Sequence, residues 1–200
     1  MSAVTTADAE HRATTHRRIV RAAERCFLEF GPARTTMVDV AREAGVSRPT
    51  VYRYFRDRDA VILEVLTRRV RAALGHAGRR LQDGAGLEQV LQDVIPLLVA
   101  RGRDDPMIRA LIVEEDQAGS DLELFSVALE LSSEFWEPLL VAARRRRELR
   151  DDLDVDEVCA WLAEMLMFLV SRTERADALD SDVMVRKFVV PALVAAPARP

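Results

Sequence analysis

The side chains best suited to chemistry lie close together in one short segment, Arg48-Pro49-Thr50-Val51-Tyr52-Arg53-Tyr54. Guanidinium, hydroxyl and phenol groups occur at nearly every position, and Val51 is the only branched aliphatic residue. Coiled into a helix, the segment would turn Val51 inward and project the polar groups outward. A short helix with this outer face suits the major groove of DNA, where bases are read through hydrogen bonds and methyl contacts. The segment is therefore a candidate recognition element for nucleic acid.

No other pattern in the sequence is typical of a catalytic or metal site. Cys26 and Cys159 lie far apart within apolar helical patterns, and neither has a CxxC partner or a nearby histidine. We expect both to be small core residues. The three histidines are equally scattered, at His11, His16 and His76. With no nucleophile beside a base, no metal cluster and no phosphate-binding loop, the sequence predicts neither an enzyme nor a bound cofactor or metal.

Two short helices with a tight turn between them are predicted to position the candidate segment. Thr36 can cap the start of a helix, and Asp39 three residues later completes a capping-box pattern. Gly45 is predicted to end that helix, because glycine adopts a left-handed conformation without a Cβ penalty. Ser47 then caps a third helix that continues to about Phe55. Two helices joined by a glycine-containing turn are typical of a helix-turn-helix.

Helical periodicity continues along the rest of the sequence, and alternating strand patterns are missing. Further helices are predicted at 59–81, 87–101, 106–117, 121–147, 154–175 and 181–195. The predicted fold class is all-α with about nine helices, an N-terminal three-helix bundle followed by a larger helical domain. By residue number, we expect a disordered arm at 1–14, the helix-turn-helix domain at 15–58, the larger domain at 59–195 and a tail at 196–200.

Charge is unevenly distributed between these parts. Residues 1–58 carry 11 arginines against 7 acidic residues, whereas residues 59–200 carry 18 basic and 26 acidic residues. A basic segment on an acidic body favours contact of that segment with a polyanion. Charges interrupt every apolar run before it reaches the roughly 18 residues of a membrane span, and the N-terminus lacks the apolar stretch of a signal peptide. We therefore expect a cytoplasmic protein with no membrane partner.

The motif residues resemble those of a known family. Thr35-Thr36, then Val40-Ala41-x-x-Ala44-Gly45-Val46-Ser47, then Thr50-Val51-Tyr52-x-Tyr54-Phe55 are similar to the DNA-binding signature of TetR-type transcriptional regulators. The resemblance covers about residues 16–66. It implies a homodimer on palindromic double-stranded operator DNA, and a repressor that a small-molecule effector releases from that operator. A transcriptional activator, or a ligand-independent DNA-binding protein of the same fold, is the alternative.

The resemblance also implies which side chains contact DNA. Thr36 would contact a phosphate at the start of the second helix, and Arg48 and Thr50 would face bases from the recognition helix. The implied set is Thr35, Thr36, Ser47, Arg48, Pro49, Thr50, Tyr52, Arg53, Tyr54 and Arg58.

Five members of this set carry an alternative or a departure from the family. Arg48 would face a base, or else be merely solvated. Tyr52 and Tyr54 would touch the DNA backbone or a base edge, or else pack on the fourth helix as surface aromatics. Arg58 replaces the phosphate-binding lysine that is usual in the family, and it keeps the charge. Pro49 replaces the commoner glycine and removes a backbone donor, which can alter the operator sequence without abolishing DNA binding.

The C-terminal helices are implied to hold the effector and the dimer interface. The candidate effector-binding residues are Leu98, Ile108, Arg109, Leu111, Ile112, Phe125, Leu129, Phe135, Trp136 and Met165. For the apolar candidates a place in the ordinary core is the alternative, and for Arg109 the alternative is a solvated face. The last two helices, predicted at 154–175 and 181–195, would form the dimer interface. Trp161 and Phe168 extend the apolar surface of the first of these beyond one core-facing side, although a simply central helix would show the same pattern.

Overall fold

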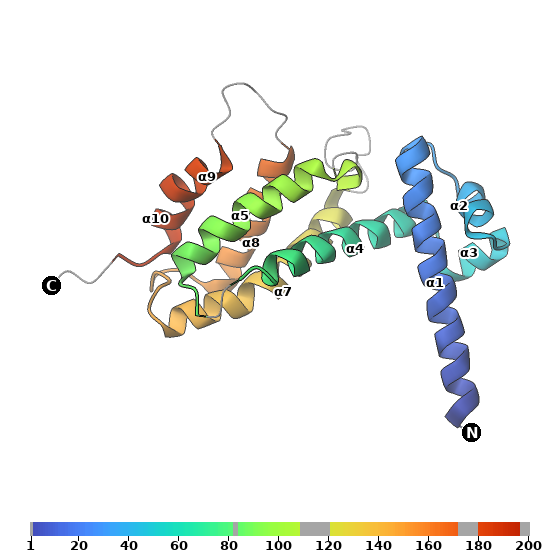
Figure 1. The fold of residues 1–200 in the computed structure, drawn as a ribbon, viewed down its shortest axis with the longest axis horizontal. Coiled ribbons are helices and arrows are strands. Elements are labelled where there is room, and N and C mark those ends of the chain that lie inside the picture. The colour runs from blue at the N-terminus through green and yellow to red at the C-terminus, as the bar shows by residue number, and fades with distance from the viewer. Residues whose placement is uncertain (1, 82–83, 109–120, 172–179, 197–200) are drawn as a thin grey trace. The chain divides into compact units, whose positions relative to one another are not determined.

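In the computed structural model the chain is described at residues 2–81, 84–108, 121–171 and 180–196. Within these ranges it is almost entirely helical and contains no strand, as the sequence predicts (Figure 1). The helices are α1 (Ser2–Phe30), α2 (Met37–Ala44), α3 (Arg48–Tyr54), α4 (Arg58–Gly78), α5 (Leu87–Asp104), α7 (Asp121–Arg145), α8 (Val155–Ser171), α9 (Ser181–Met184), η1 (Val185–Val189) and α10 (Val190–Leu193). Residues 106–108 are also helical, and the rest of the helix predicted at 106–117 lies outside the described residues.

The chain divides into two compact units, Met1–Arg68 and Arg69–Pro200. The sequence places the boundary ten residues earlier, between Arg58 and Asp59, where the fourth helix begins. The first turns of α4 instead belong to the first unit, and they carry the buried side chains of Val61 and Val65. Because these apolar residues continue the core of the first unit, the start of a helix is not the end of a domain here.

Helix α1 is longer than the sequence predicts. It begins at Ser2, so the expectation of a disordered arm over residues 1–14 is corrected for residues 2–14. The expectation followed from the missing apolar periodicity in this segment. Residues 2–30 contain no glycine or proline, and several alanines favour helix, so nothing in the backbone interrupts α1. Its first turns extend past α2 and α3 (Figure 1).

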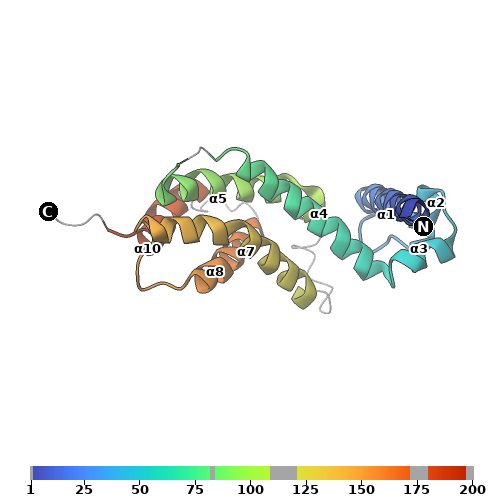
Figure 2. The same cartoon turned by 90° about the horizontal axis from the view of Figure 1, so that it is seen from below.

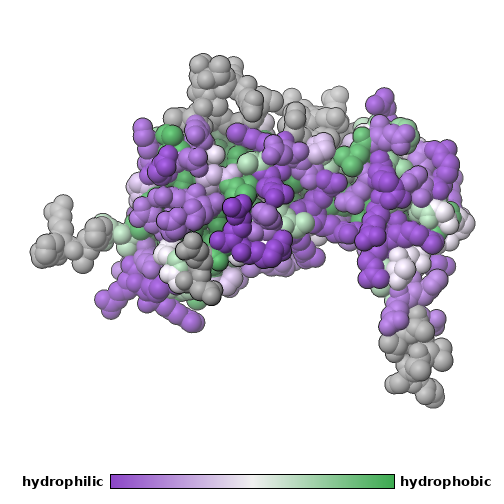
Figure 3. Space-filling model, viewed as in Figure 1, coloured by the Kyte–Doolittle hydropathy of each residue, from purple (hydrophilic) through white to green (hydrophobic). Residues whose placement is uncertain are grey.

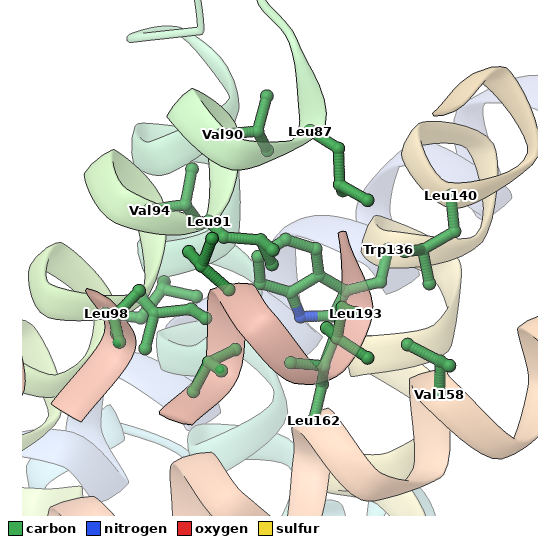
Figure 4. Packing of buried hydrophobic residues seen from close by; sticks show 14 of the residues in the cluster. Leu87, Val90, Leu91, Val94, Leu98, Trp136, Leu140, Val158, Leu162 and Leu193 are labelled. Atoms are coloured by element: carbon green, nitrogen blue, oxygen red, sulfur yellow. The ribbon is translucent and has the colours of Figure 1, made fainter. Parts of the chain in front are cut away.

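The second unit is built around one apolar core contributed by α5, α7, α8, η1 and α10. Trp136 of α7 lies at its centre, fully buried, with Leu91 of α5 and Leu162 of α8 in the same cluster (Figure 4). Figure 2 shows α4, α5, α7 and α8 of this unit from a second side. On the face drawn in Figure 3, hydrophilic side chains cover most of the described surface, as expected when the apolar residues are inside.

Both cysteines are buried, as the sequence predicts. Burial raises the pKa of the Cys26 thiol, and the nearby Glu43 carboxylate raises it further. Burial, with a smaller contribution from Asp156, raises the pKa of Cys159 to about 11. A thiol with a raised pKa carries little thiolate at neutral pH, which makes it a poor nucleophile and metal ligand.

Gly102 allows α5 and α8 to approach closely. A Cβ atom at this position would lie 2.6 Å from Cγ2 and 3.0 Å from Cγ1 of Val170. Valine has a stiff χ1 torsion, so its methyl groups cannot easily rotate away. The absence of a side chain at Gly102 is therefore needed for the packing of these two helices.

Replacing Gly102 with alanine is expected to lower the free energy of unfolding by about 1–3 kcal/mol through overpacking. Urea titration of wild type and Gly102→Ala measures the change. In a Val170→Ala background the same substitution should be neutral or stabilising, because the clashing methyl groups are gone and alanine favours helix over glycine by about 1 kcal/mol. Equal destabilisation in both backgrounds would contradict the packing argument.

The connection between α7 and α8 supplies a carboxylate that caps another helix. Oε2 of Glu148 accepts a hydrogen bond of 2.8 Å from the backbone N–H of Leu87 at the start of α5, where Gly86 has no capping side chain. Arg146 donates to both carboxylate oxygens, at 2.9 and 3.0 Å. The hydrogen bonds from Arg146, with a further one from Leu87, hold the pKa of Glu148 below its usual value.

Replacing Glu148 with alanine is expected to lower the free energy of unfolding by about 1 kcal/mol near pH 7, because the Leu87 N–H loses its acceptor. The pKa of Glu148 is lower in the folded state than in the unfolded state. Its carboxylate therefore stabilises the fold at pH values above the unfolded-state pKa, and this stabilisation is lost as the pH falls through the folded-state pKa. Urea titrations of both proteins near pH 7 and near pH 3 measure the difference, which should shrink in acid. Glu130→Ala, an exposed position on α7, is the control. A difference that does not depend on pH would contradict the prediction.

Candidate nucleic-acid interface

Helix α2 begins with the capping box that the sequence predicts. The Thr36 hydroxyl oxygen accepts from the backbone N–H of Asp39 at 3.2 Å, and the Asp39 carboxylate accepts from the backbone N–H of Thr36 at 3.1 Å. The same hydroxyl donates to Oδ2 of Asp39 at 2.6 Å. The two hydrogen bonds that Thr36 donates to the carboxylate lower the pKa of Asp39. Thr36 is exposed, so its side chain is held in place at the surface where the helix begins.

Gly45 makes the turn between α2 and α3. Its φ of 61° and ψ of 38° lie in the left-handed region, as the sequence predicts. Ser47 then caps α3, because its hydroxyl oxygen accepts from the backbone N–H of Thr50 at 3.3 Å. Pro49 lies in the first turn of α3, where a missing N–H leaves no intrahelical bond unmade. The turn and the two caps fix where α3 starts and which way its side chains project.

Helix α3 separates a buried side from an exposed one. Val51 is fully buried, whereas Arg48, Tyr52 and Arg53 are exposed. The guanidinium carbon of Arg48 lies 5.3 Å from the ring centroid of Tyr52, and Nη2 lies 3.4 Å from the Tyr52 hydroxyl. Arg48 and Tyr52 therefore hold each other in position on the outer face, one helical turn apart.

The second tyrosine of α3 lies against α1. Tyr54 is half-buried, and its ring centroid is 6.1 Å from that of His16. His16 also stacks on Phe55, with a centroid distance of 5.0 Å and an interplanar angle of 30°. The guanidinium carbon of Arg53 lies 5.5 Å from the centroid of the Tyr54 ring. Sequence reasoning left His16 without a role, although its position three residues before the buried Ile19 places it on the inner face of α1.

Two predicted DNA contacts have partners within the first unit. Nη1 of Arg58 donates to the backbone carbonyl of Ala33 at 2.7 Å, which ties the start of α4 to the turn after α1. Thr35 is only 2% exposed, and its hydroxyl lies in donor range of the carbonyls of Cys26 and Gly31, at 3.2 and 2.9 Å. The Thr35 hydroxyl is therefore engaged within the first unit, and its predicted contact with DNA stays a prediction.

The predicted effector-binding residues fall into three groups. Leu98 and Trp136 are part of the core of the second unit, and Phe135 and Met165 pack against it while only partly buried. Ile108 is buried and Leu129 half-buried. Arg109, Leu111 and Ile112 lie outside the described residues, and Phe125 lies outside the described side chains.

The described part of the chain contains no candidate for a metal site or for a membrane-spanning helix. Its histidines, cysteines and acidic residues form no group of three or more that could hold a metal ion. No described helix is long and apolar enough to cross a membrane.

Sequence comparisons identify similar proteins over most of the chain. The family model described as bacterial regulatory proteins, tetR family, matches residues 19–65. An uncharacterised HTH-type transcriptional regulator of Mycobacterium bovis is 30% identical over 171 residues, which cover 85% of this chain and 86% of the relative. An HTH-type transcriptional repressor of Mycobacterium tuberculosis is 26% identical over 166 residues, with coverage of 82% and 84%.

Solved structures with the same fold also cover most of this chain. RolR, solved in complex with its ligand resorcinol, gives a TM-score of 0.69 at 16% identity and covers 92% of this chain and 90% of its own. The fatty acid degradation regulator FadR from Bacillus halodurans gives 0.58 at 16% identity, with coverage of 85% and 93%. With its capped helix-turn-helix and a 30% identical relative matched over 86% of that relative's length, this chain belongs to the tetR family of bacterial transcriptional regulators.

Proposed function

We propose that the protein is a homodimeric repressor that binds a palindromic operator in the cytoplasm and is released by a small-molecule effector. The observation that carries the DNA-binding part is the outer face of α3, where Arg48 and Tyr52 are exposed and hold each other in position. Arginine can donate two parallel hydrogen bonds to a guanine edge, the commonest specific contact in the major groove. Exposed Thr36 adds a hydroxyl for a phosphate at the start of α2.

A dimer is required because one short recognition helix makes too few base contacts for specific binding. Support for its interface comes from large aromatic side chains exposed on the last two long helical segments. Trp161 and Phe168 of α8 are 39% and 57% exposed, and Phe188 of η1 is 56% exposed. Aromatic residues are enriched at protein–protein interfaces relative to the rest of a protein's surface. We assign these residues to the interface with a second copy, in keeping with the predicted role of the last two helices.

Effector control is supported by continuity of α4 and by the names of related proteins. Helix α4 begins at Arg58 in the first unit and ends at Gly78 in the second, so one helix contributes residues to both units. A ligand that favours one position of this helix changes the spacing of the two recognition helices and thereby the affinity for DNA. One relative is named a repressor and one structural neighbour was solved with resorcinol bound.

Selection of bound duplexes from a random DNA library tests the proposal. We expect an inverted repeat with half-sites about 10 base pairs apart, centre to centre, bound by two copies of the chain. A reporter gene behind the selected operator then separates repression from activation, since a repressor lowers expression. Enrichment of no sequence, with binding that salt abolishes equally on every duplex, would show sequence-independent binding and refute the operator assignment.

A further inference from the structure

Four cationic side chains gather at the surface of the second unit, where α4 ends beside α5. Nη2 of Arg101 on α5 lies 3.2 Å from Nε2 of His76 on α4. Arg79 and Arg80 follow in the turn after α4, and the backbone N–H of Arg79 still bonds to the Gly75 carbonyl as in a helix, at 3.2 Å. His76 is half-buried, whereas the three arginines are exposed. We refer to His76, Arg79, Arg80 and Arg101 as the basic cluster.

The members of the basic cluster act on one another electrostatically. Arg101 has the largest effect on His76 and lowers the pKa of its imidazole below the ordinary value. Partial burial lowers that pKa further, and Arg79 and Arg80 add smaller contributions of the same sign. An arginine side chain can only donate, so Nε2 of His76 accepts from Arg101 and the ring proton is assigned to Nδ1. The neutral imidazole is therefore held among three positive charges.

These positive charges have no counter-charge among the described residues. None of the three arginines forms an ion pair with a carboxylate of the residues that the structure describes. Several arginines elsewhere in the same unit are paired, for example Arg69 with Asp105 and Arg146 with Glu148, at 2.6 and 2.9 Å. The excess of cations is local, because residues 69–200 as a whole carry 17 basic and 24 acidic residues. A group of unpaired cations in an acidic unit favours a bound anion.

The donors of the basic cluster determine the kind of anion. A guanidinium carries five N–H groups in one plane, which match two oxygens of a phosphate or carboxylate, and only one hydrogen bond of Arg101 is described. The three arginines attract a dianion about twice as strongly as a monoanion. Screening limits surface electrostatics to about 10 Å at 0.1 M salt. A small anion is therefore affected mainly by the nearby arginines, whereas a long polyanion also meets the acidic residues of the unit.

Compensation of the helix dipole is the ordinary explanation for basic residues at this place. Cations near a helix C-terminus interact favourably with its last carbonyl groups, which accounts for Arg79 and Arg80. It does not account for Arg101, which belongs to a different helix and donates to His76. The two explanations differ in a measurable way. Dipole compensation needs no anion, whereas an anion site predicts saturable binding that depends on the charge of the anion.

We propose that the basic cluster binds a small dianionic oxyanion, such as free phosphate or the phosphate group of a small organic molecule. Arg101 donates to its oxygens, and Arg79, Arg80 and a protonated His76 add positive charge around them. The site belongs to the surface of the second unit, so it shares no residue with α3 or with the apolar core. It is a binding function in addition to the proposed operator binding and its release.

His76 reports binding at the basic cluster directly. The full-length protein contains three histidines, so ¹³C-labelled imidazoles give three titration curves by NMR, and His76→Gln identifies the relevant one. Titrations are recorded in sulfate, which stays dianionic over the pH range of histidine, and in sodium chloride of equal ionic strength as the control for screening. Sulfate should raise the pKa of His76 by about 0.5–1 relative to chloride, in a saturable way, because a bound anion favours the protonated ring. His11 and His16 should titrate equally in both salts.

Single substitutions separate the basic cluster from general surface charge. Arg101→Gln and Arg79→Gln should each weaken sulfate binding by about threefold to tenfold, because each removes one positive charge beside the anion. Without sulfate, Arg101→Gln should also raise the pKa of His76, since it removes the strongest cationic neighbour. Arg71→Gln is the matched control, because Arg71 is exposed on α4 and lies 4.0 Å from Glu134 on α7, outside the cluster. This variant should bind sulfate like wild type.

Two phosphate probes distinguish the source of the anion. Competition with bound sulfate is measured for inorganic phosphate and for phenyl phosphate. Equal affinity indicates free phosphate as the ligand, and tighter binding of phenyl phosphate indicates a phosphorylated organic molecule. In either case the site binds the phosphate group.

The inference is overturned if sulfate and chloride give the same pKa for His76, or if Arg101→Gln and Arg79→Gln both bind sulfate like wild type. Arg79→Gln changes an exposed side chain in a turn, so it keeps the test valid if Arg101→Gln folds poorly. Operator binding by α3 is measured separately, by fluorescence anisotropy in chloride. Because the two sites share no residue, failure of the anion site leaves the proposed function in place.

Discussion

Replacing Arg48 with alanine is expected to weaken binding to the selected operator by roughly a hundredfold or more. A bidentate contact between arginine and a base contributes about 1–3 kcal/mol of discrimination, and a dimer loses the contact twice. The loss should be accompanied by relaxed sequence preference at one base pair of each half-site. Fluorescence anisotropy with the operator, and with operators changed at each position, measures both effects.

Arg48→Lys separates base reading from simple attraction to phosphate. Lysine keeps the charge but lacks the planar fork that binds two acceptors, so this variant should bind almost as weakly as Arg48→Ala. Tyr52→Phe removes the hydroxyl that lies 3.4 Å from Arg48 and keeps the ring below the guanidinium. It should therefore cost less than either change at Arg48. Full recovery of affinity and specificity in Arg48→Lys would mean that Arg48 contacts only the DNA backbone.

Replacing Phe188 with aspartate should convert the dimer into a folded monomer. Burying a phenylalanine contributes about 1.5–3 kcal/mol, and a two-fold symmetric interface contains the residue twice. With the added cost of burying a carboxylate, the dimer dissociation constant should rise roughly a thousandfold or more. Sedimentation velocity at micromolar protein measures the change, and circular dichroism shows whether the helices are retained.

Leu28→Asp is the matched control for this experiment. Leu28 is 51% exposed, nearly as much as Phe188, but it lies on α1 in the first unit. The substitution introduces the same charge on an exposed apolar residue and should leave the dimer intact. If Phe188→Asp stays dimeric with unchanged affinity, the interface lies elsewhere, and Trp161→Asp on α8 tests whether that helix alone forms it.

The parts of the site that sequence reasoning predicts correctly depend on neighbours in the chain. The capping box of Thr36 and Asp39, the left-handed Gly45 and the cap of Ser47 each involve residues within three positions of one another. Their side chains compete for a few backbone groups at known spacing, so the residue types determine the result. The bounds of α2 and α3 and the exposed face of α3 follow from the same local information.

The parts that sequence reasoning misses depend on contacts between distant segments. Thr35 is buried because the turn after α1 places it against the carbonyl of Cys26, nine residues away. His16 stacks on Phe55 across a separation of nearly 40 positions, which no local pattern reports. The capping of Leu87 by Glu148 spans an even longer stretch of chain. Such contacts form only when packing brings the helices together, so local sequence patterns do not predict them.

The continuity of α4 across the unit boundary has a consequence for building hybrid regulators. Each residue inserted into a helix turns everything beyond it by about 100° and moves it by about 1.5 Å. The chain divides at Arg68 and Arg69, inside α4 rather than in a loop. A chimera that joins residues 1–68 to the C-terminal unit of another family member should therefore keep the helical phase at the junction.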